Sequence, residues 1–121
     1  MNERKRRTEA QNRFMWPMFR QIAQHLNKAN AGSGQATLTD EDMHDYFLDQ
    51  YQQEVVAVPS LGIAISKRGR TSDMTVAQFA GLLEFTMAWA STRGISVMVP
   101  KDYEAWAERA RYGKGYAAGG V

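Results

Sequence analysis

Hydrophobic residues recur every three or four positions through most of the chain, a spacing typical of amphipathic helices. The first such stretch runs from Thr8, a predicted N-cap, to about Lys28. Its apolar stripe consists of Phe14, Met15, Met18, Phe19, Ile22 and Leu26. Pro17 lies inside the stretch, where it removes one helical hydrogen bond and crowds the preceding turn. We therefore expect a kink or a restart of the helix at Pro17.

Three further helices follow the same pattern. Their predicted starts are Thr39, Thr75 and Pro100. The first of them would extend to about Gln52 and bury one apolar face, made by Met43, Phe47 and Leu48. The second should end at Arg93-Gly94, and the third carries Tyr103, Trp106, Ala107 and Ala110.

Two short β-branched runs, 55–58 and 63–65, flank the turn residues Pro59-Ser60-Leu61-Gly62 and predict a β-hairpin. The predicted fold class is therefore α+β, a helix-dominated single domain of about four helices with a short hairpin. The domain would occupy residues 8–112. A basic flexible N-terminus, 1–7, would precede it, and a glycine-rich flexible tail, 113–121, would follow.

Composition narrows the class of protein. The 121 residues fit one domain, and no apolar run approaches the length of a membrane span. Cysteine is absent, which excludes disulfides and thiolate chemistry. The charged first residues do not resemble a secretory signal. We expect a cytoplasmic protein.

Charge is distributed unevenly along the chain. Residues 1–20 carry six basic and two acidic side chains, whereas residues 29–66 carry six acidic side chains and no lysine or arginine. Such asymmetry indicates a surface that faces a polyanion and a separate acidic surface. The alternative is that solvated helices simply differ in charge.

A helical wheel of the first stretch places Arg13, Trp16 and Arg20 together, opposite the apolar stripe, with Asn12 at the border. Cations neutralise phosphates and an exposed ring stacks on unpaired bases, so this strip suits single-stranded nucleic acid. By spacing alone, the better supported interpretation is that Trp16 lies at the edge of the core and both arginines are merely solvated. Gln11 falls within the apolar sector and would need hydrogen-bond partners there.

The segment from Lys67 to Ser72 is a second candidate for phosphate binding. It places three cations, Lys67, Arg68 and Arg70, around a glycine, followed by Thr71 and Ser72 before a helix N-terminus. The glycine spacing of a nucleotide-binding P-loop is absent. An ordinary solvated connection explains the segment about as well.

Catalysis is not expected, and no metal or cofactor is predicted. Glu41, Asp45 and Asp49 share one side of the second predicted helix, where acids usually form a solvated face. A metal-dependent, structure-selective endonuclease using Asp45, Asp49 and another acid with magnesium stays an alternative. His44 lies beside Asp45 and shows no ligand spacing with His25. Another alternative is a protein-only adaptor that docks through the acidic helix or the tail.

The stretch Arg7-Thr8-Glu9-Ala10-Gln11-Asn12-Arg13-Phe14-Met15-Trp16 resembles the signature of the NinB (Orf) family of phage recombination mediator proteins. That signature is Arg-Ser/Thr, two variable residues, Gln-Asn, a short gap and Trp. A second block is similar in order and spacing: Thr71-Ser72-Asp73-Met74, then Phe79 to Glu84, then Thr92 to Ile95. The resemblance covers roughly residues 7–112.

The resemblance implies a homodimer of mixed α/β fold that assists recombinase loading onto single-stranded DNA in phage homologous recombination, inside the bacterial host. It implies binding to single-stranded DNA and to the host single-stranded-DNA-binding protein, without catalysis. The residues expected to bind DNA, by position in the motifs and by the basic pattern around them, are Arg6, Arg7, Gln11, Asn12, Arg13, Trp16, Arg20, Lys67, Arg68, Arg70, Thr71 and Ser72.

Two departures from the family pattern follow. The usual β region ahead of the motif is not in this sequence, as expected for a truncated chain or a shorter branch. Asp73 occupies a position where the family has a basic residue, and an acid there would repel phosphate. We expect Arg68 or Arg70 to supply that cation instead.

Overall fold

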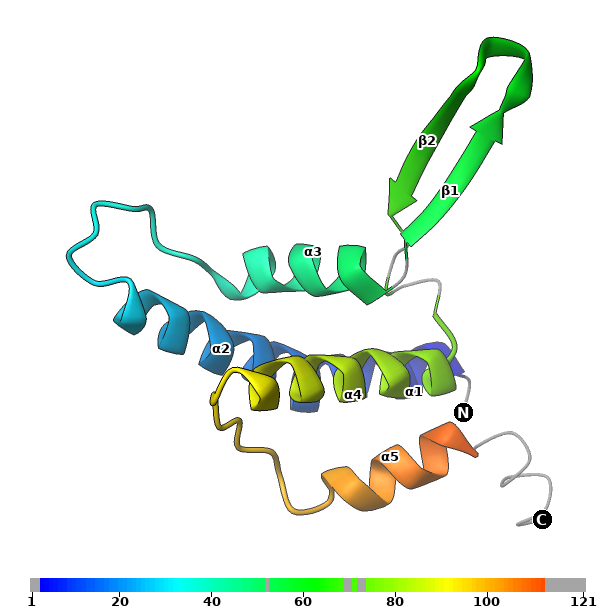
Figure 1. The fold of residues 1–121 in the computed structure, drawn as a ribbon. Helices are drawn as coiled ribbons and strands as arrows, with labels where there is room; N and C mark the ends of the chain where they lie inside the picture. Colours follow the sequence, from blue (N-terminus) through cyan, green and yellow to red (C-terminus); the bar gives the residue numbers. More distant parts are fainter. Residues whose placement is uncertain (1–2, 52, 69–70, 72–73, 113–121) are drawn as a thin grey trace.

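The computed structural model describes residues 3–51, 53–68, 71 and 74–112. The chain opens with one long helix made of three parts: α1 (Glu3–Ala10), the π-helix η1 (Gln11–Met15) and α2 (Trp16–Ala29) (Figure 1). The helix begins at Glu3, so the prediction that Thr8 caps it was wrong. Residues 3–7, expected to be flexible, are helical. The buried side chain of Arg7, in the last turn of α1, ties this helix to the rest of the protein.

The π-helix η1 allows the first helix to accommodate Pro17. Proline cannot donate a backbone hydrogen bond, and its ring collides with the carbonyl four residues earlier in an α-helix. In η1 the turn is widened, and the Trp16 N–H donates to the carbonyl of Gln11. A regular α-helix then restarts at Trp16, with Pro17 in its first turn. The predicted restart is confirmed.

The next helices begin at capping boxes. In α3 (Asp40–Tyr51) the hydroxyl of Thr39 accepts from the Asp42 N–H at 3.1 Å, and the Asp42 carboxylate accepts from the Thr39 N–H at 2.8 Å. In α4 (Val76–Thr92) Thr75 and Gln78 make the same reciprocal pair, as predicted. Gly94 ends α4 with φ of +73°, the left-handed conformation that favours glycine.

The last described helix, α5 (Tyr103–Arg111), starts later than expected. Pro100 was predicted to open it, but the proline belongs to a turn in which its carbonyl accepts from the Tyr103 N–H at 3.0 Å. Asp102 stands at the N-cap position instead. An aspartate there suits the positive end of a helix dipole.

The predicted hairpin is present as β1 (Gln53–Val58), a short 3-10 turn η2 (Pro59–Leu61) and β2 (Ile63–Arg68). The strands are antiparallel, with Val56 opposite Ile65 and Val58 opposite Ile63. Gly62 closes the turn with φ of +66°. Figure 1 shows the hairpin standing out from the helical body beyond the end of α3.

The helices form three layers around one core, with α3 and α5 on opposite sides of the long first helix and α4 (Figure 1). Aromatic side chains connect the layers: Phe19 stacks on Phe47 of α3, and Phe14 meets Tyr103 of α5 edge to face. Within the described residues the protein is thus a mostly helical single domain with four helices and a two-stranded hairpin, which confirms the predicted fold class.

Candidate nucleic-acid interface

The residues of the predicted strip on the first helix lie on both sides of the π-helix. Asn12 and Arg13 belong to η1, whereas Trp16 and Arg20 belong to α2. A helical wheel assumes the same rotation for every residue, but a π turn contains more residues than an α turn. The structure therefore divides the strip, and Arg13 points to a different neighbour from Trp16 and Arg20.

Arg13 faces α5. Its guanidinium makes a bidentate ion pair with Asp102, in which Nη2 donates to Oδ1 at 2.8 Å and Nε donates to Oδ2 at 3.1 Å. The hydrogen bond and the charge of Asp102 raise the pKa of Arg13, and the hydrogen bond from Arg13 lowers the pKa of Asp102. Both side chains are more than half exposed. The cation is therefore at the surface but already paired with a carboxylate.

Trp16 and Arg20 face α3. Arg20 Nη2 lies 3.3 Å from Oδ2 of Asp40. The indole of Trp16 is half-buried and stacks on the imidazole of His44, with ring centroids 5.3 Å apart and planes 23° from parallel. The indole also meets Phe19 edge to face. Trp16 thus lies at the edge of the core with one face covered by His44.

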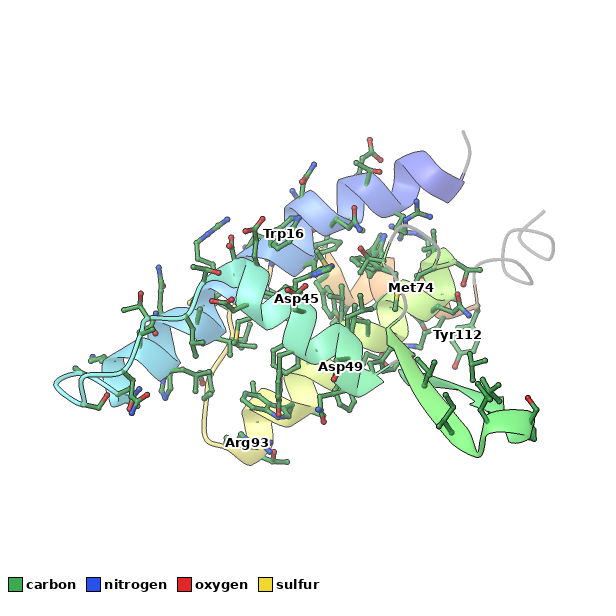
Figure 2. The ribbon with its side chains drawn as sticks, turned by 90° about the horizontal axis from the view of Figure 1, so that it is seen from above. Trp16, Asp45, Asp49, Met74, Arg93 and Tyr112 are labelled. Carbon is green, nitrogen blue, oxygen red and sulfur yellow. The ribbon has the colours of Figure 1, made fainter. Side chains whose placement is uncertain are left out.

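His44 connects the two segments that the sequence singled out. Its Nε2 lies 3.4 Å from the hydroxyl of Thr71, and its Nδ1 lies 3.2 Å from Oδ1 of Asp45. Thr71 is buried and belongs to the connection between β2 and α4. Trp16 of the first helix and Thr71 therefore contact the same imidazole (Figure 2 shows Trp16 beside Asp45 of α3). Sequence reasoning missed this role of His44, because no local spacing links these residues.

Arg7, predicted to bind DNA, is buried in the structure, with 9% of its surface exposed. Its Nη1 donates to the backbone carbonyl of Met74 at 3.0 Å, so it joins α1 to the segment before α4. This position does not fit an exposed phosphate contact. A sequence signal was available, because Arg7 precedes Phe14 of the predicted apolar stripe by seven residues and so shares its face of the helical wheel.

The remaining predicted residues are only partly described. Gln11 is half-buried, as its place in the apolar sector suggested, and Asn12 is exposed. The backbones of Arg6, Lys67 and Arg68 lie on α1 and β2, but their side chains lie outside the described part of the structure. Arg70, Ser72 and Asp73 lie outside the described residues altogether, as does the tail 113–121. The binding role of this loop stays a prediction.

The described residues hold no group of three or more His, Asp or Glu side chains that could bind a metal ion. Asp45 and Asp49, which the endonuclease alternative needs, follow each other along α3 (Figure 2), and Asp45 contacts His44. No described helix is long and apolar enough to cross a membrane.

An open, mainly apolar groove of about 680 Å³ lies where the ends of α2 and α4 meet α3. Its lining includes Leu26, Leu38, Met43, Tyr46, Trp89 and Arg93. Arg93 lies over the Trp89 ring, with its guanidinium carbon 4.1 Å from the ring centroid. None of the predicted DNA-binding residues lines this groove.

Comparison with known protein families decides the relationship. A model of the NinB protein family matches residues 2–97, which include α1 to α4 and the hairpin. The chain belongs to the NinB family. The resemblance drawn from the Gln-Asn-x-x-x-Trp motif is therefore confirmed, and membership implies a phage protein associated with recombination. Searches of curated proteins and of solved structures found no match.

Proposed function

We propose that this NinB protein binds single-stranded DNA and assists recombinase loading during phage homologous recombination, without cutting the DNA. Its partners would be single-stranded DNA, the host single-stranded-DNA-binding protein and a second copy of itself, in the cytoplasm of the bacterial host. Family membership supports a role in recombination. The arrangement of residues around His44 supports the choice of ligand.

The observation that carries the proposal is the contact of Trp16 and Thr71 with the same imidazole. In the proposed complex a base stacks on the exposed part of the half-buried indole that His44 holds in place, and such stacking is worth about 1–3 kcal/mol per base. The connection that contains Thr71 also contains Lys67, Arg68 and Arg70 in sequence, which suit the neighbouring phosphates. One strand could therefore meet both segments.

The distribution of charge favours one path for the single-stranded DNA over the surface of the protein. Asp40 and Asp45 lie on α3 beside Arg20 and His44, so a phosphate that moved along α3 would meet negative charge. The sequence of α1 and the connection before α4 is basic. We expect the strand to run from Trp16 toward these two basic segments, away from α3.

The test is fluorescence anisotropy of a labelled oligothymidine, single- against double-stranded, over a salt series. We expect single-strand binding that weakens as salt rises, and a loss of about tenfold in Trp16→Ala, because a stacked ring is removed. Trp16→Phe should retain most of the affinity, and helical content by circular dichroism checks the fold. Equal affinity of Trp16→Ala and the unmodified protein would contradict the site.

A second variant tests whether Arg13 contributes to DNA binding. Asp102→Asn frees the guanidinium, so the affinity should rise a few fold and the slope of log K against log salt should steepen by about 0.7 for one more phosphate contact. The matched control is Glu104→Gln, which removes an exposed charge from the same helix without freeing Arg13. Magnesium-dependent cleavage of branched DNA by the unmodified protein would favour the endonuclease alternative instead.

A further inference from the structure

The hairpin exposes an apolar face that the rest of the described structure does not cover. Residues two apart in a strand share a face, so the register places Val56, Val58, Ile63 and Ile65 on one side of the ribbon. Of these, Val56, Ile63 and Ile65 are 46%, 47% and 55% exposed. Leu61, in the turn at the tip, is 69% exposed.

The hairpin also stands apart from the helical body (Figure 1; Figure 2 shows the same from above). An isolated two-stranded ribbon is only marginally stable in water and needs packing on one face. The Val-Ile pairs of this face gain little from each other alone, because Val56, Ile63 and Ile65 each remain about half exposed to solvent. Such a contiguous aliphatic patch at the surface indicates an interaction site.

We propose that this face is the surface through which two copies of the chain associate, with the two hairpins packed face to face. This deepens the homodimer of the proposed function by naming the face that forms it. The chemistry fits a copy of itself because a two-fold interface needs a patch that is complementary to itself. The two cross-strand pairs, Val56 with Ile65 and Val58 with Ile63, carry no charge or hydrogen-bonding group that an unlike partner would have to match.

The size of the patch sets the expected strength. A stable interface commonly involves 20–30 residues on each side, roughly 800 Å² per partner. The apolar face and Leu61 supply five side chains, the centre of such an interface rather than the whole. We therefore expect a weak dimer that depends strongly on concentration.

The first experiment compares two single substitutions on neighbouring residues of β1. Val56→Glu puts a charge on the apolar face, whereas Ala57→Glu puts the same charge on the opposite face. In sedimentation equilibrium without DNA, Val56→Glu should raise the dimer dissociation constant at least tenfold, and Ala57→Glu should leave it unchanged. A monomeric unmodified protein at every accessible concentration, or equal effects of both variants, would overturn the proposal.

The second experiment separates a copy of this chain from any other surface. The variant Val56→Glu/Ile63→Glu carries an acidic face, and Val56→Lys/Ile63→Lys carries a basic one. These positions are diagonal in the register, so like charges are not placed directly opposite within one hairpin. Each variant alone should be monomeric, and an equimolar mixture should form heterodimers.

Failure of the mixture to associate would overturn the face-to-face arrangement, since the hairpin would then meet some other surface. Both experiments omit DNA, so their outcome is independent of the single-strand binding test. Conversely, a protein that dimerises through the hairpin but binds no oligothymidine would retain this inference and refute the proposed function.

Discussion

At the residue scale, Gly81 shows how closely two helices approach each other. Glycine in the interior of a helix costs about 1 kcal/mol relative to alanine, yet Gly81 lies in the middle of α4. The hydroxyl of Tyr51, at the end of α3, occupies the place where a Cβ of residue 81 would be. Tyr51 also packs against Phe85, one turn further along α4. The absence of a side chain at Gly81 therefore allows Tyr51 to cover α4.

We predict that Gly81→Ala lowers the free energy of unfolding by about 1 kcal/mol, because the displaced tyrosine costs more than the gain in helix propensity. Removing the hydroxyl should relieve most of this, so the double variant Gly81→Ala/Tyr51→Phe should be more stable than the sum of the two single effects. Urea denaturation of the unmodified protein, the two single variants and the double variant completes this double-mutant cycle. If the two single effects on the free energy of unfolding simply added, the hydroxyl of Tyr51 would not be what disfavours a side chain at residue 81.

Tyr103 carries the pH dependence that the structure predicts. Its side chain is 2% exposed and its hydroxyl has no hydrogen-bond partner among the described residues. Burial, assisted by the charge of Glu104, raises the pKa of Tyr103 to about 12. The folded protein therefore holds this proton at pH values at which the unfolded chain, with a pKa of about 10, has released it.

The stabilising effect is fully present below pH 10 and is lost as the pH rises toward 12, by about 2–3 kcal/mol in total. Urea denaturation between pH 9 and 11.5 should show this decline. Tyr103→Phe should flatten it and should be as stable as the unmodified protein at pH 7, because it removes an unpaired buried hydroxyl. An unchanged decline in Tyr103→Phe would assign the pH dependence to other groups.

At the element scale, Arg7 attaches α1 to the segment before α4 through its bond to the Met74 carbonyl. Arg7→Ala should lower the free energy of unfolding by about 2–3 kcal/mol, because a buried charge-assisted hydrogen bond is lost. It should also weaken DNA binding without changing the salt slope, since Arg7 would act by positioning and not by touching phosphate. Glu9→Ala, an exposed position on the same helix, is the control for both measurements.

A salt slope that decreased in Arg7→Ala would indicate a direct phosphate contact. In that case the buried position of Arg7 would have to change when DNA binds.

Elements with a local signal could be predicted from the sequence. The capping boxes at Thr39 and Thr75, the glycine stop after α4 and the turn between the strands all depend on neighbouring residues, and the structure contains each of them. The start of the first helix could not be predicted in this way, because α1 is joined to the protein by the contact of Arg7 with Met74, a residue far along the chain. The start of α5 was misplaced because proline suits turns as well as first helical turns.

At the scale of the whole molecule, the contacts that decide the candidate site join distant parts of the chain. Arg13 and Asp102 are separated by 89 positions, and His44 and Thr71 by 27. Residue types and spacing indicated which segments could bind DNA, but the pairing of each cation with an acid depends on how the layers pack. The two arginines of the predicted strip therefore face different helices, Arg13 toward Asp102 and Arg20 toward Asp40.

The acidic stretch of the sequence has a related explanation. Part of its charge is paired at the surface, because Asp40 forms an ion pair with Arg20. Asp42 caps the first turn of α3. A count of charges along the sequence therefore overstates how acidic the α3 surface is, and the adaptor alternative loses part of its motivation.

The π-helix between α1 and α2 limits how this chain can change its length. Deleting one residue from 11–15 would narrow this wide turn to an ordinary α-helical turn. The ring of Pro17 would then collide with the carbonyl four residues before it, although no amino acid had been replaced. Between Arg7 and Trp16 the number of residues is thus constrained as strongly as their identity.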